Sequence, residues 1–268
     1  MEFAFTEEQE QLRREVRSLL EGREPSWQEL AELGWLGVSV PEEQGGAGLG
    51  FVEEAVLAEE LGRALYPGPY FASVVLALPA LPPDARGAVV RGERTYTLAL
   101  DGQPAPDRDR VDEETEVADD ALRAEIRDRA FAALAAEAVG IAQKALELSV
   151  DYAKEREQFG RPIAVYQAVS HRIADMYVQT ELARSLAYWA AWCVAERDDE
   201  ASVAAAAAKA YAAEAAVVAC EAAIQVHGGI GFTWEHPLQR YYKRAQWIEA
   251  FGGYPAAQRA RIAAHLLD

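Results

Sequence analysis

The stretch ALRAEIRDRAFAALAAEAVGIAQKALELSVDYAKER occupies residues 121–156 and decides the fold class. Apolar side chains recur along it at every third or fourth position, which is the spacing of one face of an α-helix. The stripe consists of Leu122, Ile126, Ala130, Leu134, Ala138, Ile141, Ala145, Leu148 and Tyr152. A long helix is therefore predicted, and the loop at Gly160 and Pro162 ends it.

The residues that follow predict more helices of the same kind. Apolar periodicity indicates helices over residues 164–196, 201–226, 237–250 and 255–267. The inner face of the first is expected to carry Val165, Val169, Ile173, Tyr177, Leu182, Leu186, Trp189 and Cys193. Residues 201–223 include 14 alanines, which have the highest helix propensity and allow helices to approach closely. Residues 121–268 are thus predicted to form an antiparallel helix bundle.

Residues 1–65 predict an N-terminal helical domain. Helices are expected over residues 6–22, 27–36 and 51–65. Thr6 and Gln9 match a capping box at the start of the first helix. The glycines of GVSVPEEQGGAGLG, at residues 37–50, are compatible with a nucleotide-binding loop. No βαβ pattern surrounds them, however, so a chain reversal between helices is the favoured interpretation.

Residues 66–120 differ in character from both flanking regions. Prolines interrupt them at positions 67, 69, 79, 82, 83, 104 and 106. The segment RTYTLAL, residues 94–100, alternates as a short strand does, and the residues after it are polar and rich in turn formers. A reduced middle region or linker with little β structure is therefore expected. The whole chain is predicted to be mainly α.

The charge of the chain argues against a nucleic acid partner, and the distribution of its charged residues argues against a membrane span. Among 268 residues, 26 Lys and Arg stand against 44 Asp and Glu, which gives a formal net charge of −18. Such a chain repels phosphate backbones, so nucleic acid is not expected as a partner. No run of about 18 apolar residues is free of charged residues, so no membrane span is expected.

Cysteine and histidine usage gives no sign of a disulfide scaffold or a metal site. Cys193 and Cys220 are too few for a disulfide framework and suit a reducing compartment. Residues 1–15 are acidic and polar, so no signal peptide is expected there and a cytoplasmic location is predicted. The histidines lack acidic or cysteine partners at metal-ligand spacing, so no metal is expected. They are His171, His227, His236 and His265.

Three stretches of this sequence resemble the acyl-CoA dehydrogenase family. They are EREQFGRPIAVYQAVSHRIADM at residues 155–176, IQVHGGIGFTWEHPLQRYYKRA at residues 224–245, and an N-terminal set of FTEEQEQLRREVRSLL, ELGWLGVSVPEEQGGAGLG and EELGRAL. The resemblance implies an N-terminal helical domain, a middle β-domain and a C-terminal four-helix bundle. It also implies FAD-dependent oxidation of the α,β bond of an acyl-CoA thioester. The stretch WEHPL, followed by YYKRA, looks like members that act in actinobacterial steroid or fatty-acid breakdown.

The same resemblance assigns six candidate FAD-binding residues. Arg156 matches the arginine that holds the pyrophosphate, Phe159 an aromatic residue near the adenine, and Gln167 an amide that bonds the adenosine portion. A loop where backbone approaches the cofactor is matched by Gln225, Gly228 and Gly229. Taken singly, Arg156 also fits a surface ion pair, and the glycine pair fits an ordinary helix C-cap.

The sequence departs from the family where the chemistry should occur. Residues 66–120 contain neither the family's Thr-containing flavin motif nor its Trp-containing strand. The two family positions for the catalytic glutamate fall on Gly252 and near Ala130, and neither side chain can accept a proton. Glu249 lies one helical turn from Gly252. The Thr and Gln that follow the base in the family are replaced by Tyr254 and Ala256.

These losses form a pattern, because each FAD in the family lies across a subunit interface. The chain keeps the residues that one subunit donates to its neighbour's cofactor and lacks those that complete a site of its own. It is interpreted as one subunit of a hetero-oligomeric acyl-CoA dehydrogenase, which shares FAD with a partner that carries the catalytic Glu and most acyl-CoA contacts. Two alternatives stay open: a non-catalytic helical scaffold without FAD, and a stand-alone enzyme that uses Glu249 as the base.

Overall fold

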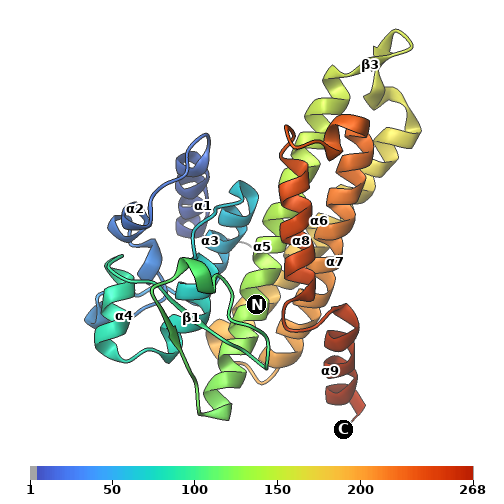
Figure 1. The fold of residues 1–268 in the computed structure, drawn as a ribbon. Coiled ribbons are helices and arrows are strands. Elements are labelled where there is room, and N and C mark those ends of the chain that lie inside the picture. The colour runs from blue at the N-terminus through green and yellow to red at the C-terminus, as the bar shows by residue number, and fades with distance from the viewer. Residues whose placement is uncertain (1–4, 268) are drawn as a thin grey trace.

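Long helices dominate the C-terminal half of the chain (Figure 1). The helices are α5 (Asp120–Glu155), α6 (Gln167–Glu196), α7 (Ala201–His227), α8 (Leu238–Ala250) and α9 (Pro255–Leu267). The first three pack against one another, α8 packs on α7 and α5, and α9 contacts α7. The computed structural model describes residues 5–267. It confirms the mainly α class and the predicted C-terminal helix bundle.

Alanine forms much of the interior between α5 and α7. Ala204, Ala208, Ala212 and Ala216 are fully buried, and each contributes a single methyl group to the helix contact. Small side chains let two helix axes lie close together while the interior stays filled. The helical stretch Ala201–Phe232 is long and apolar enough to cross a membrane by length and composition, but 67% of its most apolar window is buried within the protein.

The predicted inner face of α6 is partly wrong. Val165 (54% exposed), Tyr177 (57%) and Leu182 (51%) point away from the bundle. The buried face carries smaller or more flexible residues: Met176, Thr180, Ala183, Ala187, Ala190 and Cys193. Because apolar residues line both sides of α6, periodicity alone did not distinguish the core face from an outward apolar face.

The three expected N-terminal helices are present, and the first begins at its predicted cap. They are α1 (Glu7–Leu20), α2 (Trp27–Glu32) and α3 (Phe51–Ala64), with short 3₁₀ turns at Trp35–Gly37 and Glu42–Gln44. Thr6 accepts a hydrogen bond from the Gln9 N–H at 3.2 Å, and the Gln9 side chain accepts one from the Thr6 N–H at 3.0 Å. This reciprocal pair satisfies two amides at the helix start and confirms the predicted capping box.

The glycine-rich segment before α3 is a chain reversal. Five consecutive amides donate hydrogen bonds to backbone carbonyls of residues 37–42. They are the amides of Gly45, Gly46, Ala47, Gly48 and Leu49. The next amide, that of Gly50, donates to the Glu53 carboxylate at 2.8 Å. A phosphate-binding loop needs free N–H groups, so this segment is not one.

The middle region is short but more helical than expected. It contains a π-helix (Phe71–Ala77), a 3₁₀ turn (Leu78–Ala80), α4 (Pro83–Val90), β1 (Tyr96–Leu98), a 3₁₀ turn (Arg108–Arg110) and β2 (Glu113–Thr115). The expected strand is present as β1, which pairs in parallel with β2. The π-helix is fully buried and packs on β1 and α5. A short run that is apolar on every side has no period to read, which is why this helix was missed. The boundaries of the three domains, 1–65, 66–120 and 121–268, stay a prediction.

Two glycines bring α3 and α5 into close contact. A Cβ added at Gly140 would lie 1.9 Å from the Glu59 carbonyl oxygen, and one added at Gly62 would lie 2.3 Å from the Glu137 carbonyl oxygen. The helices therefore cross backbone to backbone. This crossing fixes the N-terminal helices against the bundle.

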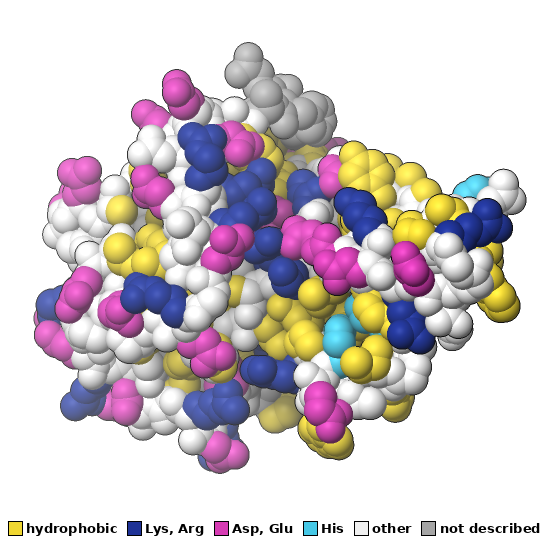
Figure 2. Space-filling view, turned by 90° about the horizontal axis from the view of Figure 1, so that it is seen from above, with side chains coloured by type: hydrophobic (Ala, Val, Ile, Leu, Met, Phe, Trp, Pro, Cys, Tyr) yellow, Lys and Arg dark blue, Asp and Glu magenta, His cyan; other side chains and the backbone are white. Residues whose placement is uncertain are grey.

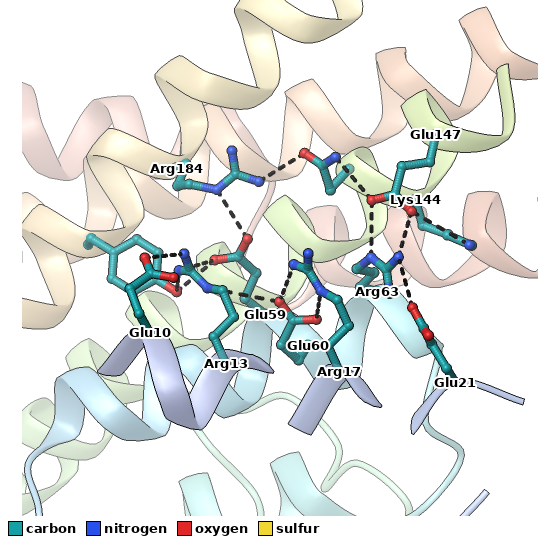
Figure 3. Close-up of polar contacts among 12 residues, drawn as sticks. Glu10, Arg13, Arg17, Glu21, Glu59, Glu60, Arg63, Lys144, Glu147 and Arg184 are labelled. Atoms are coloured by element: carbon teal, nitrogen blue, oxygen red, sulfur yellow. Dashed lines mark hydrogen bonds and ion pairs between the residues drawn. The ribbon is translucent and has the colours of Figure 1, made fainter. Parts of the chain in front are cut away.

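A buried network of charges surrounds the same contact (Figure 3). Glu60 is 1% exposed and accepts two hydrogen bonds from Arg17, at 2.6 and 3.0 Å. Glu59 is 2% exposed and accepts hydrogen bonds from three groups. The donors are the Tyr188 hydroxyl at 2.6 Å, Arg184 at 3.1 Å and Arg13 at 3.4 Å. The network thus joins α1, α3 and α6 through charged groups that are mostly withdrawn from water.

Candidate functional site

The six candidate cofactor residues lie in two connections at one end of the bundle. Arg156, Phe159 and Gln167 belong to the connection between α5 and α6, which is uppermost in Figure 1. The other three lie at the end of α7 and the start of the 3₁₀ segment Gly228–Phe232. Tyr152, one turn before Arg156, stacks on His227 with ring centroids 4.4 Å apart. This stacking ties the two connections together.

A small hairpin presents Arg156 and Phe159. Strands β3 (Glu157–Gln158) and β4 (Arg161–Pro162) pair antiparallel, and the turn between them is Phe159-Gly160. Both turn residues have positive φ, +53° and +77°, as in a type I′ hairpin turn. Phe159 is 92% exposed. Arg156 caps α5 through its N–H, which donates to the Tyr152 carbonyl at 2.8 Å.

The side chains that face solvent here are free to bind. Among the described residues, none hydrogen-bonds or forms a salt bridge with the Arg156 guanidinium, so the surface ion-pair interpretation lacks a partner within this chain. Gln167, the first residue of α6, is also exposed. The end of the molecule that carries these groups gathers exposed apolar side chains over the bundle (Figure 2). They include Phe159, Ile230, Phe232 and Trp234.

The glycines of the second connection differ in what they require. Gly228 ends α7 with φ +65° and ψ −141°, a conformation that side chains disfavour. Gly231 is buried, and a Cβ there would lie 3.0 Å from the Ile224 carbonyl oxygen. Gly229 has neither constraint, because a Cβ there would meet nothing within 4 Å. The surface at Gly229 is therefore open to close approach by another molecule, and Gln225 is exposed beside it.

Two histidines lie in or beside this connection. The Nδ1 atom of His227 lies 2.8 Å from the Ala223 carbonyl oxygen, and the His236 Nδ1 accepts the Leu238 N–H at 3.3 Å. Burial lowers the pKa of His227, and burial together with the neighbouring His227 lowers the pKa of His236. The described residues contain no group of three or more His, Cys, Asp or Glu side chains that could hold a metal ion.

Comparison with known proteins identifies the family. Residues 129–267 match the C-terminal domain of acyl-CoA dehydrogenases, and residues 21–83 match the N-terminal domain. The chain belongs to the acyl-CoA dehydrogenase family. The resemblance based on the two bundle motifs and the N-terminal pattern is thereby confirmed. The two matched segments flank residues 84–128.

The chain is similar to a mycobacterial acyl-CoA dehydrogenase and to chains of two solved structures. Acyl-CoA dehydrogenase IpdE2 of Mycolicibacterium smegmatis is 32% identical over 316 aligned residues, which cover 98% of this chain and 100% of IpdE2. A chain of the ChsE4-ChsE5 complex from Mycobacterium tuberculosis is 26% identical with a TM-score of 0.87, covering 100% of this chain and 99% of that one. A chain of the Tcur3481-Tcur3483 steroid ACAD is 28% identical with a TM-score of 0.82, covering 97% and 96%.

The two positions expected for the catalytic base, Gly252 and Ala130, lie away from the hairpin in the chain. Gly252 follows α8, whereas the Gly228-Gly229 connection precedes it. The 13-residue helix α8, about 20 Å long, lies between the two places in the chain. Gly252 has φ +65°, and a Cβ there would lie 2.4 Å from the Phe131 ring. Ala130 is fully buried. Neither position leaves space for a carboxylate in this arrangement.

Buried polar groups hold the turn that contains Gly252. The Lys209 ammonium donates to the carbonyls of Glu249 and Gly253 at 2.8 and 2.7 Å. Gln258 donates to the carbonyls of Gly252 and Gly253 at 2.8 and 3.0 Å. Burial lowers the pKa of Lys209 to about 8, partly opposed by Glu249. Burial also raises the pKa of Glu249, with a further contribution from Glu214. The turn is thus fixed by its own chain.

Several residues around the hairpin end of the bundle and around the Gly252 turn were not predicted from the sequence. Tyr152 stacks on His227, Phe131 occupies the space beside Gly252, and Lys209 pins the turn. Tyr166 contacts the hairpin and directly precedes Gln167. These contacts join segments distant in the sequence or cross a turn, and no periodic pattern marks them. The only sequence signal was that Tyr166 lies within the family-like stretch at residues 155–176.

Proposed function

We propose that this chain is the cofactor-donating subunit of a hetero-oligomeric, FAD-dependent acyl-CoA dehydrogenase. The observation that carries the proposal is the contrast between the two ends of α8. Open, unpaired groups lie at the hairpin end, while the base positions at the other end hold Gly252 and Ala130. A chain built in this way gives contacts to a neighbour's active site and forms none of its own.

The groups at the hairpin end fit one half of a dinucleotide. The free Arg156 guanidinium can form charge-assisted hydrogen bonds to a pyrophosphate, and the open backbone at Gly229 allows close approach. Gln167 and Gln225 offer amides to the adenosine portion, and Phe159 offers an aromatic face. When bound, FAD would accept the hydride that leaves the acyl-CoA. This chain's residues would bind and orient the cofactor, and no proton passes through them.

The partner is proposed to be a second acyl-CoA dehydrogenase chain that carries the catalytic Glu. Two similar solved structures are a ChsE4-ChsE5 complex and a two-component steroid ACAD, which supports assembly from unlike chains. The acyl-CoA substrate, of the steroid or fatty acyl class, would bind mainly through this partner. The free, buried thiols Cys193 and Cys220 are compatible with the proposed cytoplasmic location.

Flavin absorbance tests the proposal. The purified chain alone is expected to bind FAD weakly or not at all, whereas the complex formed with its acyl-CoA dehydrogenase partner chain is expected to be yellow. The reason is that only half of the contacts lie in each chain. A colourless complex would favour a scaffold without FAD. Stoichiometric FAD on a homo-oligomer of this chain would contradict the proposal.

Replacement of Glu249 by Gln tests whether the chain has its own base. We expect the turnover of the complex to stay within about threefold of the wild type, because a general base contributes about 10²–10⁴-fold and the proposed base belongs to the partner. Glu214→Gln, in the neighbouring exposed pair with Arg259, is the matched control. A hundredfold loss confined to Glu249→Gln, with FAD content and assembly intact, would indicate a stand-alone active site.

A further inference from the structure

The turn at the tip of the α5–α6 hairpin is in an unfavourable conformation. Phe159 has φ +53°, a region that bulky L-residues rarely adopt, and its exposed side chain is not held by a core. Type I′ turns usually place Asn or Gly at this position. Other groups must therefore hold the turn in place.

Tyr166 supplies the contacts across the hairpin. Its hydroxyl donates to the Gln158 carbonyl at 3.0 Å and accepts from the Arg161 Nε at 3.3 Å. The Arg161 guanidinium also lies over the Tyr166 ring, 4.9 Å from its centroid. The Phe159 ring meets the Tyr166 ring edge to face, with centroids 6.3 Å apart. One side chain therefore contacts both strands and the turn.

The backbone of Tyr166 is fixed by α6. Its carbonyl accepts hydrogen bonds from the amides of Val169 and Ser170, both at 2.9 Å, and so forms the first turn of the helix. Its amide donates to the Ile163 carbonyl at 3.1 Å, and the Ile163 amide donates to the Arg156 carbonyl at 2.8 Å. Tyr166 thus stands between the hairpin and the rigid end of the bundle.

We infer that Tyr166 is a positioning residue for the donated half-site, by which we mean the FAD-binding surface that this chain would offer to its partner. That surface consists of Arg156, Phe159, Gln167, Gln225, Gly228 and Gly229. By holding Gln158, Phe159 and Arg161 against the start of α6, Tyr166 fixes the relative placement of Arg156, Phe159 and Gln167 before a cofactor arrives. Preorganisation of this kind lowers the ordering cost of binding. The inference rests on the proposed function, because it gives these three residues a common ligand.

The test uses Tyr166→Phe, which removes the hydroxyl and keeps the ring. Tyr211→Phe is the matched control, since no hydrogen bond of the Tyr211 hydroxyl is found among residues 5–267. In the chain alone, hydrogen–deuterium exchange of residues 156–166 is expected to become about fivefold faster in Tyr166→Phe only, the size expected for one neutral hydrogen bond. In the co-expressed complex, the Kd for FAD is expected to rise by a similar factor.

The outcomes separate this inference from the proposed function. Unchanged exchange of the hairpin in Tyr166→Phe would overturn the positioning role whatever happens to FAD. Faster exchange with unchanged FAD affinity, in a complex where Arg156→Ala does weaken FAD, would overturn it and leave the proposed function intact. If neither Tyr166→Phe nor Arg156→Ala altered FAD affinity, the proposal that this chain contributes contacts to FAD would be contradicted. The positioning role of Tyr166 would then be contradicted as well.

Discussion

Replacement of Glu59 by Ala is expected to lower the free energy of unfolding by about 3–5 kcal/mol, which is typical when one partner of a buried ion pair is removed. Glu59 is 2% exposed and accepts hydrogen bonds from Arg13, Arg184 and Tyr188. Its removal takes the buried carboxylate away from two largely buried guanidinium groups and leaves the Tyr188 hydroxyl without its acceptor. At hydrogen-bond distance, Arg13 then keeps only the more exposed Glu10 among the carboxylates of the described residues. Arg184 likewise keeps only the more exposed Glu181 among them. Equilibrium unfolding in urea, followed by far-ultraviolet circular dichroism, measures the loss.

Glu214→Ala is the matched control for Glu59→Ala. Glu214 pairs with Arg259, and the two side chains are 49% and 60% exposed. Exposed pairs contribute about 0–1 kcal/mol, so little change is expected. Equal losses in the two variants would show that burial does not determine the strength of these pairs, and the buried network would then not be what holds the N-terminal helices to the bundle.

Replacement of Arg156 by Ala is expected to weaken FAD binding to the assembled complex by about ten- to a hundredfold. The guanidinium has no partner among the described residues, so its charge is available for the pyrophosphate. A charge-assisted hydrogen bond in a binding site is worth about this factor. Arg156→Lys keeps the charge but loses the planar fork, so an intermediate loss is expected. Equilibrium titration of the apo complex with FAD measures the affinity.

Lys154→Ala controls for long-range electrostatics, because Lys154 is an exposed cation in the last turn of α5. The free energy of unfolding of the chain is expected to stay unchanged in both variants. If Lys154→Ala weakened FAD as much as Arg156→Ala, general charge rather than a specific contact would explain the effect. Unchanged FAD affinity in Arg156→Ala would remove the pyrophosphate role.

Local signals predicted most helices because their causes are local. Thr6 and Gln9 mark the start of α1 through hydrogen bonds three residues apart, and Gly160 and Pro162 mark the loop after α5. The π-helix Phe71–Ala77 gave no such signal, since all its residues are buried and no polar side breaks the pattern. The orientation of α6 also escaped prediction, because it depends on which neighbours the helix meets.

The candidate site divides in the same way. Arg156, Phe159, Gln167, Gln225, Gly228 and Gly229 could be proposed from the sequence because they lie in contiguous motifs that resemble a family. The side chains that surround the hairpin and the Gly252 turn were not predicted, because their positions depend on packing. The Phe131 ring beside Gly252 and the Lys209 ammonium under the same turn come from other helices. The Tyr166 hydroxyl reaches back across a hairpin whose shape the sequence did not indicate.

The alanine interior of α5 and α7 bears on how stability changes with temperature. A buried alanine exposes one methyl group when the chain unfolds, which is far less apolar area than leucine or isoleucine exposes. The apolar area that unfolding exposes largely sets the heat capacity change of unfolding. For the bundle, this change is therefore expected to be smaller than the ~12–15 cal/mol/K per residue of ordinary globular proteins. A smaller heat capacity change gives a flatter stability curve, so the bundle keeps more of its maximum stability on cooling and on warming.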